Sequence, residues 1–296
     1  MSSEPTTGVQ TCYRHDDRRA GVRCQRCGRA ICPSCMNQAS VGFHCPECVK
    51  QSGQRVVTSR SLAAQATPYV TMVLISLNVA IYVMSTAATG GSLGGAPART
   101  FELDWALIGQ GVVAGGPFGA GAVIGVAEGE WYRLVTSGFL HGSLLHLGFN
   151  MFALWILGRQ LEPALGRINF AAIYFSSLLA GSLGVMVLDP NQLTLGASGA
   201  VFGLFGYAVV GQYARGINPM DTGLGGIIVI NLIFTFAVPG ISIGGHLGGL
   251  IGGAAAGALM DLLRPRINAP VWVGSVLVVV LGAGCSLASI AIGNGL

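Results

Sequence analysis

The sequence contains little charge. Asp, Glu, Lys and Arg make up 9% of its 296 residues, against about 25% in an average soluble domain. Because 52% of the residues are hydrophobic, much of the surface cannot face water, which excludes an ordinary soluble protein. Cysteine is nearly absent beyond residue 48, where only Cys285 remains. The first 60 residues lack the apolar run of a secretory signal peptide, and we expect none. The low charge and the uneven distribution of cysteine predict a membrane protein with a separate cysteine-rich N-terminal part.

Four short pairs of metal-binding residues lie in that part, and two residues separate the members of each pair. The pairs are Cys12 with His15, Cys24 with Cys27, Cys32 with Cys35, and Cys45 with Cys48. Eight such ligands fill two tetrahedral zinc sites. His44 is an alternative to Cys45 as a ligand. A disulfide scaffold, the rival interpretation, would need an oxidising compartment. We predict two structural Zn²⁺ ions that provide the folding free energy, because so short a segment has almost no apolar core.

This pattern resembles B-box-type zinc fingers. The resemblance implies a cross-braced fold, in which the first pair shares a metal with the third and the second pair shares one with the fourth. Every ligand is then used, so we expect a docking module without catalysis, with a cytosolic protein as its candidate partner. A basic finger can also contact nucleic acid or anionic lipid headgroups. We favour docking and expect no nucleic acid partner.

Composition divides the chain into four parts. We predict a double-zinc module at 1–50 and a polar linker at 51–66. A helical membrane core with a long first loop (87–130) follows at 67–266, and one more membrane helix at 267–296. The long loop is rich in Gly and Pro at 90–97 and 115–121. Between these runs we expect partly ordered structure at the outer membrane interface, where Trp105, Trp131 and Tyr132 can act as anchors.

Seven apolar stretches are long enough, or nearly so, to cross a bilayer, which takes about 20 residues. They cover roughly 68–86, 141–160, 169–188, 198–214, 222–240, 242–262 and 270–292. The fourth is short, because it begins at Ser198 and ends near Arg215. The fold class predicted from this pattern is an all-α polytopic membrane protein, in contact with the lipid bilayer, with a small zinc-binding domain in front.

Arginine placement predicts the orientation. Residues 1–60 hold nine Lys/Arg against four Asp/Glu, and cytoplasmic segments carry such an excess. With the N-terminus inside, the inner loops carry Arg159, Arg167, Arg215, Arg264 and Arg266. We therefore expect a multi-pass protein of the cell membrane, best matched by a bacterial plasma membrane, with a cytoplasmic N-terminus. The second, fourth and sixth segments then all run from outside to inside.

Four polar side chains fall in the outer part of those three segments: His146, Asn150, Ser198 and His246. Polar groups in hydrocarbon are costly and usually functional. A serine hydroxyl needs a positioned base, and His246 is the candidate. Glycines at every fourth residue around it favour close helix packing, which brings the two side chains together. No Asp or Glu lies near enough to orient the base, so we predict a Ser198–His246 dyad with Phe202 packed on the imidazole.

His146 and Asn150 lie four residues apart on one helix face. Together with the backbone N–H of Ser198 at a helix N-terminus, they can stabilise an oxyanion. Alternatives exist for each part. A lone membrane serine is more often bonded to a backbone carbonyl, and lone histidines serve proton relays or metals. A transporter would need charged residues deeper along several helices and an internal repeat, and the sequence has neither.

These residues resemble the rhomboid family of intramembrane proteases over roughly 68–262. The resemblance rests on Tyr132-Arg133, the run from His141 to Asn150, Gly196-Ala197-Ser198-Gly199, and the run from Gly245 to Gly253. The family usually has Trp where this chain has Tyr132, a conservative departure.

The resemblance implies a six-helix core and a seventh helix beyond it. It also implies a serine endopeptidase that cleaves single-span membrane proteins in or near their transmembrane segments. In this family Ser198 would be the nucleophile and His246 the base, while His146, Asn150 and the Ser198 amide would form the oxyanion hole. Gly196 would belong to the site loop, Glu162 to a structural contact, and no metal would serve catalysis. The alternative is a catalytically inactive rhomboid-like protein that binds client transmembrane helices.

Overall fold

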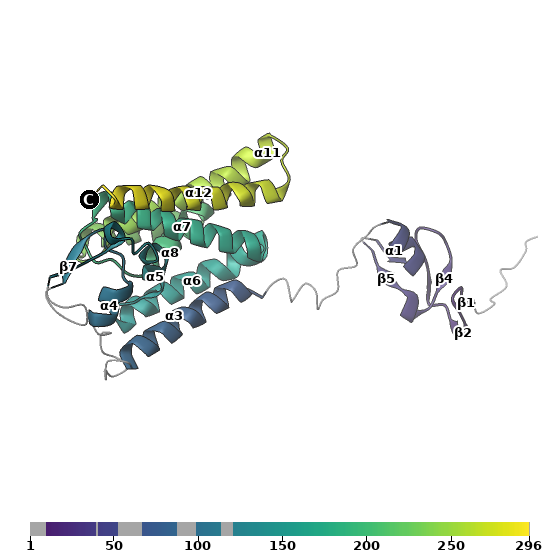
Figure 1. Ribbon diagram of the computed structural model, residues 1–296. Helices are drawn as coiled ribbons and strands as arrows, with labels where there is room; N and C mark the ends of the chain where they lie inside the picture. The colour runs from purple at the N-terminus through teal and green to yellow at the C-terminus, as the bar shows by residue number, and fades with distance from the viewer. Residues whose placement is uncertain (1–9, 40, 53–66, 88–98, 114–120, 296) are drawn as a thin grey trace, which may run out of the picture. The chain divides into compact units, whose positions relative to one another are not determined.

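A computed structural model describes residues 10–39, 41–52, 67–87, 99–113 and 121–295 (Figure 1). The chain divides into two compact units, residues 1–65 and 66–296. The predicted linker 51–66 lies almost wholly outside the described residues, so its bounds stay a prediction. Each unit is described by itself below.

The N-terminal unit is built from three two-stranded antiparallel sheets. Its strands are β1 (Thr11–Cys12), β2 (His15–Arg19), β3 (Val22–Arg23), β4 (Ala30–Ile31), β5 (Asn37–Gln38) and β6 (Phe43–His44). A 3₁₀ turn, η1 (Pro33–Cys35), and the helix α1 (Pro46–Ser52) complete it. Apart from Ile31, its buried core consists of cysteine side chains. So small an apolar core cannot by itself offset the entropy of ordering the chain.

The second unit is helical. Its long elements are α3 (Tyr69–Ala87), α6 (Leu144–Leu165), α7 (Arg167–Leu188), α8 (Ser198–Ala214), α9 (Leu224–Ala237), α10 (Ile243–Gly257) and α12 (Val271–Gly293). A π-helical turn, η4 (Ala258–Leu263), continues α10 into α11 (Arg264–Arg266). The first loop contributes α4 (Arg99–Trp105), β7 (Gly111–Val113), β8 (Ala122–Ile124), η2 (Val126–Glu128), α5 (Arg133–Thr136) and η3 (Ser137–Phe139). Figure 1 shows α3, α6, α7 and α12 running side by side.

The seven long helices lie where the seven apolar stretches predicted them, and they confirm an all-α polytopic fold. By length and composition four of them can span a bilayer: α3, α7, α10 continued into α11, and α12. The number rises to five if the segment of α5 and η3 is counted as one span with α6, from which it is bent by 95°. Of the remaining two, α8 has 17 residues and is as short as predicted, whereas α9 has 14 and is shorter than the predicted stretch 222–240.

Glycine lets three helices approach backbone to backbone. A Cβ at Gly249 of α10 would overlap the carbonyl oxygen of Gly199 in α8, and a Cβ at Gly253 would overlap that of Gly203. On the other face of α10, a Cβ at Gly244 would overlap the carbonyl oxygen of Gly184 in α7. The approach of α10 to α8 was predicted from the four-residue glycine repeat, whereas its approach to α7 was not. The close packing fixes α8 and α10 against each other at the depth of Ser198 and His246.

Glu162 ties the end of α6 to the start of α3. Its carboxylate is 1% exposed and accepts hydrogen bonds from the backbone N–H groups of Val70 and Thr71 and from the Thr71 hydroxyl, at 2.8–2.9 Å. The first N–H groups of a helix have no intrahelical partner, and a negative charge there is stabilising. Glu162 therefore makes the structural contact that the family resemblance implied.

The first loop is partly ordered, as expected, although its Gly-rich runs 90–97 and 115–120 lie outside the described residues. The buried guanidinium of Arg133 donates to the carbonyl oxygens of Leu103 and Ala106 and pairs with Glu130. Leu107 forms an isolated β-bridge with Thr194, at 2.7 and 2.9 Å. The loop is thus hydrogen-bonded to the segment just before α8.

The three predicted anchors of this loop have exposed side chains: Trp105, Trp131 and Tyr132. The rings of Trp105 and Tyr132 meet edge to face, 5.5 Å apart. The seventh helix, α12, packs along α7, where the Ser176 hydroxyl donates to the carbonyl oxygen of Val278 at 2.6 Å. An additional helix therefore covers one side of the core.

Candidate active site and candidate metal sites

Ser198 is the first residue of α8, and the residues before it shape the approach to its hydroxyl. Gly196 has φ +127°, a conformation that L side chains rarely adopt, and its N–H donates to the carbonyl oxygen of Ser137 at 2.9 Å. A Cβ at Gly196 would lie 2.7 Å from Nε2 of His146 and 3.7 Å from Oγ of Ser198. Only glycine leaves room here, so the imidazole and the hydroxyl face the same small space.

His246 lies in the first turn of α10. Ser242 caps this helix, its hydroxyl accepting a hydrogen bond from the N–H of Gly245 at 3.0 Å. The imidazole stacks on the ring of Phe202, with 4.0 Å between ring centroids and 17° between planes. The predicted packing of Phe202 on the histidine is therefore present. It holds the plane of the imidazole without a carboxylate.

The second contact of the His246 ring was not predicted. Nδ1 lies 2.7 Å from Oγ1 of Thr235, which comes from α9 and is 2% exposed. Thr235 is a single hydroxyl in an apolar helix, and such a residue usually bonds only to its own backbone. Its position near the outer end of the fifth predicted span was the available signal, since that end lies at the depth of His246.

His146 and Asn150 project from the first two turns of α6. This helix begins at Leu144, after the hydroxyl of Ser143 caps the N–H of His146 at 3.2 Å. One amide N–H of Asn150 donates to the carbonyl oxygen of His146 at 3.0 Å, which leaves the second amide N–H for another acceptor. The ring of His146 also meets that of the buried His141 edge to face, 4.9 Å apart.

A cavity of about 1000 Å³ brings the predicted residues together. Ser198, His246, His146 and Asn150 all line it. Within the described part of the chain, no hydrogen bond joins Ser198 Oγ to either imidazole. Catalytic hydrogen bonds are often long in a protein without substrate. Most of the remaining wall is apolar and comes from α6, α8 and α9, including Phe149, Phe152, Ile230 and Phe234. An apolar segment of another molecule fits such a lining.

In the N-terminal unit the eight predicted ligands gather into two groups of four. The first consists of Cys12, His15, Cys32 and Cys35, and the second of Cys24, Cys27, Cys45 and Cys48. Within each group the ligand atoms all lie within 4.8 Å of one another. This is the cross-braced pairing that the B-box resemblance implied. His44 belongs to neither group.

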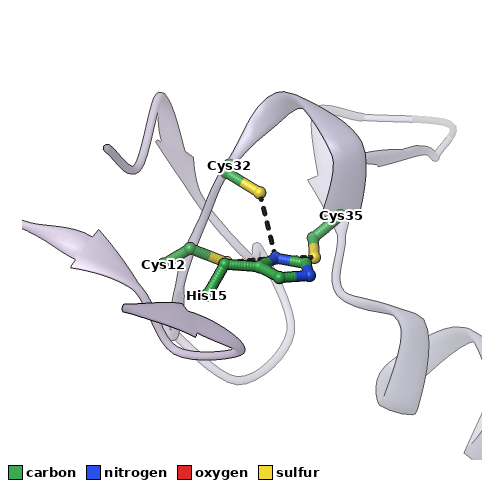
Figure 2. Close-up of side chains that lie close together, drawn as sticks. All are labelled: Cys12, His15, Cys32 and Cys35. Carbon is green, nitrogen blue, oxygen red and sulfur yellow. Dashed lines mark hydrogen bonds between the residues drawn. The ribbon is translucent and has the colours of Figure 1, made fainter. Parts of the chain in front are cut away.

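Figure 2 shows the first group, with three sulfur atoms around one imidazole nitrogen. His15 Nδ1 lies 3.7, 3.4 and 3.3 Å from the sulfur atoms of Cys12, Cys32 and Cys35. A tetrahedral Zn²⁺ with Zn–S bonds of about 2.3 Å and a Zn–N bond of about 2.0–2.1 Å would place sulfur and nitrogen about 3.6 Å apart. The donor set and its spacing therefore fit zinc. All eight cysteines of the chain are free of disulfides.

Thiol acidity also fits a cation in the first group. Burial of the Cys12 thiol raises its pKa, but hydrogen bonds from the backbone of Arg14 and Cys32 outweigh this and lower the pKa to about 6. Burial and the neighbouring sulfur atoms of Cys12 and Cys32 raise the pKa of Cys35 to about 11. Each thiolate thus disfavours ionisation of the neighbouring thiol, and a divalent cation between them would offset this repulsion.

These observations point to a multi-pass helical membrane protein with a polar site among its helices and a separate Cys/His module. Residues 128–261, a little under half of the chain, match the family model of the Rhomboid domain. Over these residues the chain is similar to proteins of the rhomboid family.

Curated relatives extend the match. The rhomboid protease GluP of Bacillus subtilis is 38% identical over 170 residues, which cover 56% of this chain and 33% of that protein. The RHOMBOID-like protein 5 of Arabidopsis thaliana is 43% identical over 83 residues, 27% of each chain. The inactive RHOMBOID-like protein 8 of the same plant is 33% identical over 106 residues, covering 36% of this chain and 30% of that protein. The chain spans less than half the length of these relatives.

Proposed function

We propose that the membrane unit is an intramembrane serine endopeptidase that cleaves single-span membrane proteins in or near their transmembrane segments. One observation carries the proposal: Ser198 and His246 line a single apolar cavity with His146 and Asn150. Polar side chains in a membrane core are costly without a function. The match to a family with named proteases supports the same reaction class.

In the proposed reaction, Oγ of Ser198 attacks the carbonyl carbon of the substrate peptide bond. His246 takes the hydroxyl proton as general base and returns it to the leaving amine as that carbon–nitrogen bond breaks. A water molecule then attacks the acyl ester, gives a proton to His246 and releases the acid, and the serine regains its proton. The step needs neither metal nor cofactor.

The negative charge that develops on the carbonyl oxygen needs donors in place. We assign this role to His146, to the free amide N–H of Asn150 and to the backbone N–H of Ser198 at the start of α8. Loss of one such donor typically costs about 2.7–4 kcal/mol of transition-state stabilisation. Gly196 supports the arrangement because its missing side chain leaves His146 room to approach.

The arginine distribution supports a cell-membrane protein, best matched by a bacterial plasma membrane, with its N-terminus in the cytoplasm and its active site towards the outer side. The module then lies in the cytoplasm, where two Zn²⁺ ions would hold it folded. We infer that it recruits a cytosolic protein, either a regulator or the cytosolic tail of a substrate. The test is to delete the module and measure which native substrates are cleaved; we expect the choice among them to change.

The deciding experiment compares purified wild type, Ser198→Ala and His246→Ala on a fluorescent single-span substrate in liposomes. Ser289→Ala is the control for removal of a serine hydroxyl from a membrane helix, because the Ser289 hydroxyl is buried in α12, bonded to the Cys285 carbonyl, and lies outside the cavity. We expect wild type and the control to cleave and both dyad variants to fall at least about a thousandfold. Equal cleavage by all four would indicate a contaminant or another nucleophile.

A serine-reactive fluorophosphonate probe resolves the remaining outcome. If no variant cleaves but Ser198 of the wild type is labelled, the substrate is wrong and the nucleophile stands. If Ser198 is not labelled either, the inactive, client-binding alternative replaces the protease.

A further inference from the structure

Thr235 is a buried hydroxyl in α9, a helix whose side chains are otherwise apolar except for Asn231. Its neighbours Phe234 and Phe236 are 56% and 60% exposed, whereas Thr235 is 2% exposed and lines the cavity. Its position on α9 brings it against the edge of the His246 ring, while Phe202 of α8 covers the ring face. The imidazole is therefore held by two helices, and only one of these contacts is polar.

The hydrogen-bond partners of Thr235 favour one position of the proton on the His246 ring. Oγ1 lies 2.8 Å from the carbonyl oxygen of Asn231 and 2.7 Å from Nδ1 of His246. A carbonyl oxygen only accepts, and a hydroxyl has one proton to give. With that proton on the Asn231 side, the hydroxyl oxygen accepts from Nδ1–H. A neutral imidazole protonated at Nδ1 has a free lone pair at Nε2.

We propose that Thr235 is a positioning residue that holds His246 in the tautomer able to take a proton from Ser198. The inference rests on the proposed protease function, because it assigns His246 the role of base. It gives a neutral hydroxyl the task that a carboxylate performs in a triad, in line with the lack of an acidic partner at the His246 ring among the described residues.

The contact also ties the base to α9. This helix has 14 residues, and its large side chains Ile230, Ile233 and Phe236 are more than half exposed. Movement of α9 away from α10 would separate Thr235 from His246 and release the imidazole to either tautomer. Docking of α9 is thus a condition for a correctly protonated base.

The test compares Thr235→Val, which removes the hydroxyl and keeps the branched shape, with Thr235→Ser, which keeps the hydroxyl. Ser289→Ala again controls for loss of a buried hydroxyl bonded to a carbonyl four residues earlier. We expect kcat on the liposome substrate to fall about tenfold in Thr235→Val, the effect of one net hydrogen bond, with KM unchanged. Thr235→Ser should stay near wild type.

A spectroscopic signature separates positioning from packing. In protein labelled with ¹⁵N histidine, the ring shifts of His246, assigned with His246→Ala, report the tautomer directly. We expect Nδ1–H in wild type and Thr235→Ser, and a mixture of tautomers in Thr235→Val. Unchanged shifts and unchanged kcat in Thr235→Val would overturn the proposal, and so would an equal loss of kcat in both variants.

Failure of the protease proposal gives a different result. If wild type neither cleaves nor takes the fluorophosphonate probe, the base has no reaction to serve, and the role of Thr235 in catalysis is overturned with it. If wild type is labelled and Thr235→Val is labelled equally fast, only the inference about Thr235 fails.

Discussion

The two units of this chain are held together in opposite ways: the N-terminal unit buries almost no apolar side chains besides cysteine, whereas the membrane unit has an extended apolar core. In the N-terminal unit the buried side chains are almost all cysteines that can bind a metal. In the membrane unit α8 and α10 approach each other without side chains between them, because Gly249 and Gly253 of α10 meet the backbone at Gly199 and Gly203 of α8. The first unit has two groups of residues that could bind metal ions, and the second relies on glycines that let helix backbones meet. They should therefore fail under different treatments.

Removal of metal should have the largest effect, and only on the first unit. Structural zinc provides about 10–16 kcal/mol in comparable small folds at neutral pH. We expect two zinc ions per chain by elemental analysis, and after chelation, rapid proteolysis within residues 10–52 with the helical unit intact. Cys24→Ser should lose one of the two ions, whereas Cys285→Ser, which lies outside both groups, should keep both. Protease resistance of the metal-free module would contradict the claim that the N-terminal unit needs metal to stay folded.

A single methyl group should damage the second unit and spare the first. At Gly253 a Cβ meets the backbone of Gly203, which cannot turn aside as a side chain does. Gly253→Ala should cost about 3 kcal/mol, at the upper end of the range for overpacking. At Gly284 in α12 a Cβ meets nothing within 4 Å, so Gly284→Ala should be neutral or slightly stabilising. Unfolding in detergent measures the stability of both variants. Equal stability would contradict the claim that close backbone packing at Gly253 holds the helices together. Both should retain their zinc.

The smallest expected effect concerns the independence of the units. If the module only selects partners, deletion of residues 1–60 should leave cleavage of a generic single-span substrate within about twofold, since surface changes remote from a site alter little. The choice among native substrates in cells should change. Unchanged cleavage of every native substrate would refute the recruitment hypothesis, and loss of generic activity would mean that the module supports the membrane unit.

Local sequence patterns predicted both units well. The spacing within each Cys/His pair predicted the eight ligands, and the B-box resemblance implied which pairs lie together. The glycine repeat predicted the approach of α10 to α8. Helix ends were predicted less well, although the signals were present. Ser143 is a good N-cap, so α6 begins at Leu144 rather than at residue 141. Pro239 disfavours helix at Val238, which is extended (ψ 116°), and α9 ends at Ala237 rather than near residue 240.

Contacts between distant segments could not be predicted in the same way. The bond from Thr235 to His246 depends on the rotation of α9 about its axis, which no feature of its apolar sequence determines. The left-handed φ of Gly196 depends on the segment to which it is bonded, at Ser137, almost 60 residues earlier. The strands β7 and β8 are three residues each, too short for a periodic pattern to indicate them.

The bridge between Leu107 and Thr194 bears on how freely the first loop can evolve. It joins main-chain atoms only, so its two hydrogen bonds are available whichever side chains stand at those positions, proline excepted. The loop can therefore exchange most of its residues, and with them its outward surface, while still bracing the segment that leads into Ser198. The outer surface of the loop can vary while the segment before Ser198 stays in place, because main-chain hydrogen bonds connect the two.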